Sequence, residues 1–145
     1  MHVLPDDFET NVKDQVHLLN QGKVLEALDL YFDDTGIMFE NDNLFAQDKA
    51  ESRKKQEPYI KSAKAIAGRI EDLIMIPEQQ VCLFLNKSSF TDQEGQEIHI
   101  NGLHWQQWKR NKIQEERYYH GSRMQELITK GLTRTPDKLK LWLEK

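Results

Sequence analysis

The stretch "HINGLHWQQWKRNKIQEERYYHG", residues 99 to 121, decides the fold of this chain. It holds three histidines, two tryptophans and two tyrosines on either side of a short basic turn. A helical projection gives these residues no continuous apolar stripe, whereas two extended strands joined at Arg110 and Asn111 alternate polar with aromatic side chains. The stretch therefore predicts a β-hairpin with more polar groups than a plain core requires.

Alternation along each strand of this hairpin assigns its side chains to two faces. On the first strand, one face carries Ile98, Ile100, His104, Gln106 and Trp108, and the other carries Leu103 and Trp105. On the second strand, one set is Glu116, Tyr118 and His120, and the other is Glu115, Arg117 and Tyr119.

Period-two patterns continue upstream of the hairpin and predict two further strands. One runs from about residue 65 to the residue before Pro77, and the next covers residues 81–90. An acidic, glycine-containing turn at residues 91–96 leads into the long strand 97–109. Three consecutive hairpins predict a strongly curved antiparallel sheet.

Helical spacing dominates the first quarter of the chain. Aspartates at positions 6 and 7 are candidate caps of a first helix that Gly22 ends, and a second helix starts near Lys23 and ends at residues 33–36. The apolar residues that fall on the buried stripes of the two helices are Phe8, Val12, Val16, Leu19, Val24, Leu28, Tyr31 and Phe32. Residues 37–40 are predicted to form a short strand.

Helical signals return at two further places. Asp48 opens a highly charged helix that extends to about residue 62, and Pro58 is expected to kink or interrupt it. Ser122 and Thr135 mark the starts of two short C-terminal helices. Helices followed by a meander predict an α+β domain that spans residues 1–145, with residues 122–145 as a C-terminal helical extension.

Composition narrows the setting in which this domain works. The 145 residues carry 20 basic and 24 acidic side chains, a net charge of −4, which argues against a dedicated nucleic-acid binder. Cys82 is the single cysteine, so no internal disulfide forms and a reducing compartment is expected. The apolar runs are too short to span a bilayer, and the first ten residues lack the apolar segment of a signal peptide. We therefore expect a cytoplasmic protein that binds neither membrane nor nucleic acid.

Two segments resemble the nuclear transport factor 2-like superfamily, which includes ketosteroid isomerases and SnoaL-like cyclases. The first is "LLNQGKVLEALDLYFDDTGIMFE", residues 18–40, where two helices flank an Asn/Gly turn and an aromatic residue with two aspartates precedes a strand. The second is "WKRNKIQEERYY", residues 108–119, with a turn, a Lys-Ile pair and an Arg-x-Tyr. The resemblance covers residues 8 to 120. It implies a cone, in which the curved sheet wraps around the N-terminal helices and encloses a deep pocket.

The resemblance also implies which residues face the pocket. His104 falls where ketosteroid isomerases place the acid that binds the oxyanion, and Glu116, Tyr118 and His120 fall on pocket-facing positions. A wall of this kind accounts for the mixed polar and aromatic character of the hairpin. In isomerases of this type a carboxylate base faces a donor pair made of a tyrosine and a protonated acid, and burial tunes the pKa of these groups.

The chain departs from that pattern at the positions that carry the chemistry. Gln15 stands at the position of the isomerase tyrosine, and Phe39 stands at the position of the catalytic aspartate. Glu40 follows Phe39, and a one-residue bulge could turn it inward. Gly121 occupies a position where many SnoaL-like proteins carry an acidic residue. These departures argue against steroid isomerase chemistry and against the usual cyclase chemistry.

Two functional hypotheses remain, and neither involves a cofactor or a metal ion. The first, favoured because the base positions are unmatched, is a module that binds a small, partly apolar molecule. The second is a cofactor-free acid–base enzyme of the isomerase, cyclase or dehydratase type that acts on a carbonyl compound. The candidate catalytic residues are His104, His120 and Glu116, and the candidate ligand-binding residues are Gln15, Glu40, Tyr59, Gln106, Trp108 and Tyr118. Two titratable groups within reach of one point in the cavity would favour the enzyme.

Several of these residues also have a purely structural interpretation. His104 could be a hydrogen-bonded core histidine, and Trp108 and Tyr118 could serve packing alone. Cys82, in an apolar strand, is expected to be an inert core thiol. On the outer face of the sheet, Leu103 and Trp105 would leave exposed apolar surface, so we expect a homodimer through that face.

Overall fold

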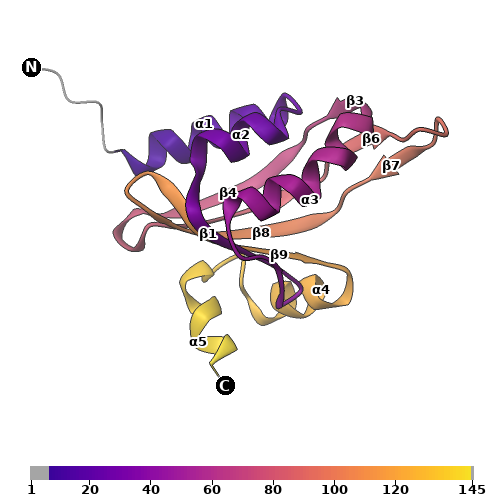
Figure 1. Cartoon of the computed structure of the whole chain (residues 1–145). Coiled ribbons are helices and arrows are strands. Elements are labelled where there is room, and N and C mark those ends of the chain that lie inside the picture. Colours follow the sequence, from indigo (N-terminus) through magenta and orange to yellow (C-terminus); the bar gives the residue numbers. More distant parts are fainter. Residues whose placement is uncertain (1–6, 145) are drawn as a thin grey trace, which may run out of the picture.

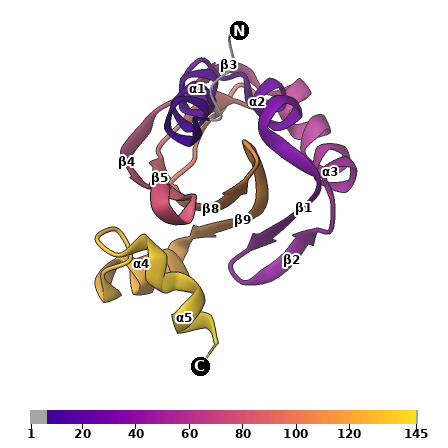
Figure 2. The same cartoon turned by 90° about the vertical axis from the view of Figure 1, so that its left-hand side faces the viewer.

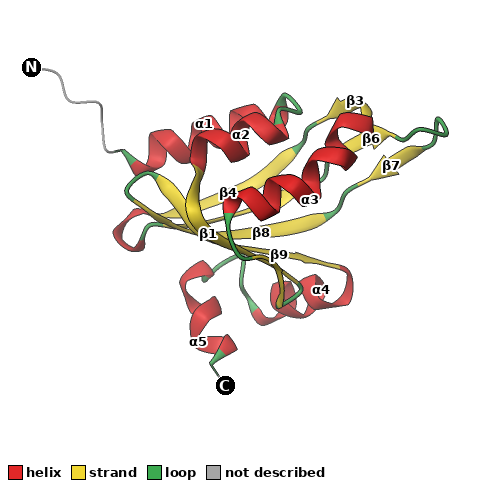
Figure 3. Ribbon diagram, viewed as in Figure 1, coloured by secondary structure: helices red, strands yellow, loops and turns green. Residues whose placement is uncertain are grey.

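The structure is a computed structural model that describes residues 7–144 (Figures 1 and 3). In chain order its elements are α1 (Phe8–Asn20), α2 (Val24–Tyr31), β1 (Phe32–Glu40), β2 (Asn43–Ala46), α3 (Lys49–Ser62), β3 (Lys64–Ala67), β4 (Ile70–Ile76), η1 (Pro77–Gln79), β5 (Val81–Asn86), β6 (Ser89–Thr91), β7 (Glu97–His99), β8 (Gly102–Lys109), β9 (Lys112–His120), α4 (Gly121–Lys130), η2 (Pro136–Lys138) and α5 (Leu139–Leu143). No helix within the described residues is both long and apolar enough to cross a membrane.

The strands form a large sheet in the order β2-β1-β9-β8-β5-β4 and a small sheet in the order β3-β6-β7. The large sheet curves around α1, α2 and α3, while α4 and α5 lie on its other side (Figures 1 and 2). The predicted α+β fold, with a curved sheet wrapped around the N-terminal helices, is confirmed. The sheet is antiparallel except between β1 and β9, which run parallel. These two strands are far apart in sequence, so no tight turn forces them to be antiparallel.

Each of the three long predicted strands is divided in two, which corrects the prediction of continuous strands. The divisions fall between β3 and β4, between β5 and β6, and between β7 and β8. The first one is at Gly68, where the end of α1 approaches so closely that a Cβ atom would lie 1.9 Å from the carbonyl oxygen of Leu19. β3, β6 and β7 then pair with one another in the small sheet.

The N-terminal helices form the inner core on the concave side of the large sheet. The Asp7 side chain caps α1 by accepting hydrogen bonds from the backbone N–H groups of Glu9 (3.1 Å) and Thr10 (3.4 Å). Asp6, the other predicted cap, lies outside the described residues. The buried members of this core are Phe8, Val12, Leu28, Phe32, Cys82, Trp108 and Ile113. Each large apolar side chain buried here stabilises the fold by roughly 1.5–3 kcal/mol.

In the first half of the chain, the structure differs from the sequence prediction around β1 and β2 and agrees with it for α3. Residues 33–36, predicted as the end of the second helix, belong to β1, which begins directly after α2. β2 was not predicted, although its turn residues Asn41 and Asp42 adopt the left-handed conformation that suits a tight hairpin (φ 46° and 70°). α3 runs from Lys49 to Ser62 with Asp48 as its N-cap, as predicted, and Pro58 does not interrupt it.

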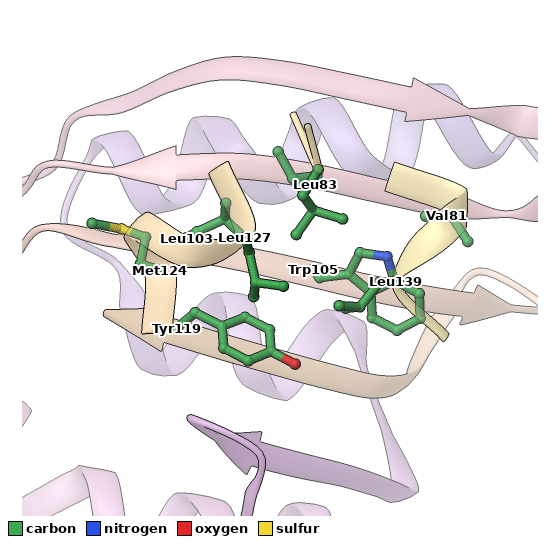
Figure 4. Packing of buried hydrophobic residues seen from close by; sticks show 9 residues of the cluster. Val81, Leu83, Leu103, Trp105, Tyr119, Met124, Leu127 and Leu139 are labelled. Atoms are coloured by element: carbon green, nitrogen blue, oxygen red, sulfur yellow. The ribbon is translucent and has the colours of Figure 1, made fainter. Parts of the chain in front are cut away.

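The outer face of the sheet is covered by the C-terminal segment, residues 121–143, contrary to the prediction of an exposed apolar surface. Leu103 and Trp105 are 0% and 1% exposed. They belong to a second core whose buried members are Val81, Leu83, Leu103, Trp105, Tyr119, Met124, Leu127, Leu132 and Leu139 (Figure 4). The apolar side chains of this face pack against the two helices that follow the last strand, so the face is not exposed.

Polar contacts fix the C-terminal segment on this face. The indole N–H of Trp105 donates to the carbonyl oxygen of Pro136 at 2.8 Å, and the ammonium of Lys140 donates to the Glu115 carboxylate at 2.8 Å. Burial raises the pKa of Glu115, but hydrogen bonds from Lys140 and Arg117 outweigh it and hold this pKa below its ordinary value. Because this face is covered within the chain, exposed apolar surface is no longer a reason to expect a homodimer. The homodimer stays a prediction, to be checked by sedimentation at micromolar concentration.

Candidate functional site

A row of hydrogen-bonded polar side chains crosses the concave face of β8 and β9. Gln106 is fully buried, and its carbonyl oxygen accepts from Gln15 (3.0 Å), from the Trp108 indole (2.9 Å) and from the Cys82 thiol (3.2 Å). Its amide nitrogen donates to Gln15 Oε1 (2.8 Å) and to Glu116 Oε1 (3.2 Å). Every polar atom of Gln106 is therefore used to hold its neighbours in place.

The second carboxylate oxygen of Glu116, Oε2, is hydrogen-bonded to Nδ1 of His104. Both side chains are largely buried, with 9% and 16% of their surfaces exposed. Neighbouring strands bring them together, because Gln106 pairs with Glu116 and His104 pairs with Tyr118 in the register of β8 against β9. The row thus ends in an imidazole that a carboxylate orients.

The hydrogen-bond network also fixes which His104 nitrogen carries the proton. The side-chain oxygen of Asn86, Oδ1, accepts a hydrogen bond from the backbone N–H of Ser88 at 3.1 Å. The side-chain nitrogen of Asn86, Nδ2, is therefore the atom that faces His104 Nε2, at 3.3 Å. An amide nitrogen only donates, so Nε2 accepts and the proton lies on Nδ1, which donates to Glu116. In this tautomer Nε2 carries the free electron pair of the ring.

Aromatic rings surround this imidazole. Phe84 stacks on His104 with centroids 4.9 Å apart, and Tyr118 lies on its other side at 4.8 Å. The Tyr118 ring fits there because it packs over Gly102, where a Cβ atom would come within 2.3 Å of the ring. Burial, with further contributions from the charges of Glu40 and Glu116, raises the pKa of Tyr118 to about 12. Its phenol therefore stays a protonated donor at neutral pH.

A second histidine–carboxylate pair lies at the rim of the site. His120 Nε2 is 3.0 Å from Glu40 Oε2, and both side chains are nearly half exposed. Glu40 pairs with Tyr118 across β1 and β9, and the register of β1 against β2 shifts between Met38 and Phe39. Glu40 therefore shares the concave face with Tyr118 and faces the site, which the sequence alone left open.

The sheet and the helices enclose a hollow in front of these groups. Its outer part has a volume of about 550 Å³ and its inner part about 290 Å³. The two parts share the lining residues Leu19, Val24, Phe45, Gln56, Ile60, Asn86 and Ile100, so they form one hollow. The inner part is where Glu40, His104, Glu116 and Tyr118 converge. A small adjoining space of about 60 Å³ is lined in part by Gln15 and Gln106.

Two predicted ligand-binding residues have other surroundings. Trp108 does not line the hollow. Its ring is 1% exposed and packs edge-on against Phe8 (5.9 Å between centroids) and against Tyr31 (5.6 Å). Tyr59 lines only the outer part and is 74% exposed. The prediction of an inert Cys82 agrees with its complete burial, which raises the pKa of the thiol.

The sequence analysis missed Asn86, which touches His104 and lines both parts of the hollow. Alternation from the buried Cys82 and Phe84 places Asn86 on the concave face, and this is the signal along the chain that could have identified it. Within the described residues no three His, Cys, Asp or Glu side chains form a group that could hold a metal ion.

Comparisons with known proteins place this arrangement in a fold. No protein-family model matches the sequence, and no curated protein is significantly similar to it. A candidate SnoaL-like polyketide cyclase from Mesorhizobium loti aligns with a TM-score of 0.65 and 21% identity over 79% of this chain and 99% of that chain. A nuclear transport factor 2-like protein of unknown function from Cytophaga hutchinsonii aligns at 0.59 and 17% over 78% and 98%.

A third solved structure has a described role. It is an epoxide hydrolase/cyclase-like enzyme of pyran ring formation in the polyether salinomycin, and it aligns with a TM-score of 0.63 and 14% identity over 83% of this chain and 97% of that chain. The chain described here has the nuclear transport factor 2-like fold, in agreement with the resemblance of residues 8 to 120. Identities this low establish the fold and leave the function to the site.

Proposed function

We propose that this protein is a cofactor-free enzyme that moves a proton on a small, partly apolar carbonyl compound bound in the hollow. One observation carries the proposal. At the inner end of an otherwise largely apolar hollow, His104 is held in one tautomer by Glu116, with the protonated phenol of Tyr118 beside it. Several titratable groups thus converge on one point, which favours the enzyme over the binding module.

The chemistry follows from the protonation states of these groups. His104 Nε2 has a free electron pair, and its one hydrogen-bond partner among residues 7–144 is the Asn86 amide at 3.3 Å, a long bond that a ligand can replace. It would take a proton from the carbon next to the carbonyl group. The imidazolium that forms is stabilised by Glu116, as in other histidine–carboxylate pairs. General base catalysis of this kind contributes typically about 10²–10⁴-fold.

Tyr118 supplies the complementary function. Within residues 7–144 its hydroxyl has no hydrogen-bond partner, so it can donate to the oxygen that gains negative charge when the proton leaves. The proton on His104 can return to another carbon, which isomerises the molecule, or assist loss of a leaving group. The rim pair of Glu40 and His120 would exchange protons with solvent. The expected cytoplasmic location stays a prediction.

A binding module is the second candidate function, and one observation favours it. Both ring nitrogens of His104 already have hydrogen-bond partners in the absence of a ligand. In that case the polar row only orients a bound molecule and no proton moves.

The two candidates differ in one measurement on a simple ketone, β-tetralone, an apolar bicyclic carbonyl compound with acidic α-protons. We expect the protein to accelerate exchange of these protons for deuterium in D₂O, followed by proton NMR. His104→Ala and Glu116→Gln should each slow the exchange at least about tenfold. His99→Ala is the matched control, because His99 is exposed on β7 and lies outside the hollow.

The outcomes separate the two functions. Binding of β-tetralone without exchange above the buffer rate would support the binding module instead. Exchange that persists in folded His104→Ala protein would show that another group is the base. Circular dichroism of each variant verifies that it is folded.

A further inference from the structure

The charges that line the hollow are separated along its length. Among the described residues, those that line the outer part are apolar or neutral polar with one exception, Lys55 from α3, which carries an ammonium group. The inner part carries the two carboxylates Glu40 and Glu116. A bound molecule therefore meets a positive charge at the outer part and negative charges at the inner part.

The Lys55 ammonium is held in position by the wall of the hollow. It donates to the carbonyl oxygen of Phe45 at 2.5 Å and lies 5.2 Å from the centroid of the Phe45 ring. No carboxylate of the described residues lies within ion-pair distance of it, although Arg53 and Lys61 of the same helix are both paired with acidic side chains. An ammonium has three N–H donors, so two remain for another acceptor.

The space around Lys55 is polar on its other side. A recess of about 360 Å³ next to the hollow is lined by Lys55, Asn41, Asn43 and His120 together with Glu40, Leu44 and Phe45. Phe45 and Lys55 border both spaces. A molecule in the outer hollow can thus place an apolar body among α1, α2 and α3 and a charged end at this border.

We propose that the natural ligand is amphipathic, with an apolar body and one anionic group such as a carboxylate, and that Lys55 binds the anion. This deepens the proposed function, since it orients the molecule in the same hollow. The anion stays at the outer part because Lys55 attracts it there and Glu116 repels it from the inner end. The neutral, reactive end is then directed toward His104.

A pair of fluorescent probes that differ in one group tests this assignment. Anilinonaphthalene sulfonate carries a sulfonate, and phenylnaphthylamine has the same ring system without it. Lys55→Met removes the charge and keeps the apolar stem. We expect this variant to weaken sulfonate binding by a factor of about five and to leave binding of the neutral probe unchanged. Added salt should weaken sulfonate binding to the wild-type protein in the same selective way.

Two further variants serve as controls. Lys54→Met removes the neighbouring exposed charge, which lies outside the hollow, and should change neither probe. Ile60→Trp should fill the hollow where its two parts meet and weaken both probes, which locates them there.

The result that would overturn the proposal is a Lys55→Met protein that binds both probes as the wild type does or loses both equally. A wild-type protein that binds neither probe, or an Ile60→Trp protein that binds both unchanged, would also overturn it, and with it the hollow as a binding site. Selective loss of the sulfonate probe in Lys55→Met, with no exchange of β-tetralone in the wild type, would keep the ligand class and reject the catalytic function.

Discussion

Replacing Gln106 with leucine should destabilise the protein strongly, although the two side chains have similar size. Gln106 makes five hydrogen bonds in a site from which water is excluded. The substitution orphans the Trp108 indole N–H and the Gln15 amide, and each buried unsatisfied group costs roughly 1–3 kcal/mol. We therefore expect a loss of about 4 kcal/mol in the free energy of unfolding, a large part of the stability of an ordinary domain.

Gln15→Leu provides the matched comparison. It leaves Gln106 with its bonds to Trp108, Cys82 and Glu116, so it should cost only about 1–2 kcal/mol. The double variant should lose less free energy of unfolding than the two single variants added together. Each substitution alone leaves the other glutamine without its hydrogen-bond partner, and the double variant leaves neither. Gln125→Leu, at an exposed position of α4, should change stability by less than about 0.5 kcal/mol.

Urea unfolding followed by circular dichroism measures these differences by linear extrapolation. The reasoning is refuted if Gln106→Leu loses less than about 1 kcal/mol, because a buried network of this kind cannot be broken at so small a cost. It is also refuted if the two single losses simply add, since the reciprocal amide pair would then carry no coupling.

Three further predictions concern the two faces of the sheet. Trp105→Ala should cost about 3–5 kcal/mol, against about 1 kcal/mol for Trp105→Phe, in urea unfolding; equal losses would mean that the ring contributes no packing. The pKa of Glu115 is lower in the folded protein, so its contribution is present above the ordinary value of 4.5 and is lost as the pH falls through the lowered value. Amide hydrogen exchange in residues 121–143 should become faster, relative to exchange in β5, as the pH is lowered. Glu115→Gln should remove this pH dependence. If the pH dependence is unchanged in Glu115→Gln, a group other than Glu115 causes it. Gly102→Ala should displace the Tyr118 ring, cost about 1–3 kcal/mol and slow β-tetralone exchange, and full activity in this variant would contradict the role of that ring.

The sequence by itself determined the elements whose signal is local. Alternation in β8 and β9 placed His104, Gln106 and Glu116 on one face, and helical spacing with the cap at Asp7 defined α1. These features depend on a period of two or 3.6 residues and on the nearest neighbours along the chain. Together with the order of the elements they were sufficient for the α+β class, and the cone was implied by the resemblance of residues 8 to 120 to the nuclear transport factor 2-like superfamily.

Tertiary structure decided how those residues are used. Trp105 and Trp108 are the same type of residue on the same strand, β8. Trp105 is nevertheless covered by the C-terminal segment, and Trp108 is covered by α1. The bond between Glu116 and His104, and the Asn86 contact that fixes the tautomer, join residues from three strands. Burial and hydrogen bonding depend on atoms that come together only through space, so no pattern along the chain could supply them.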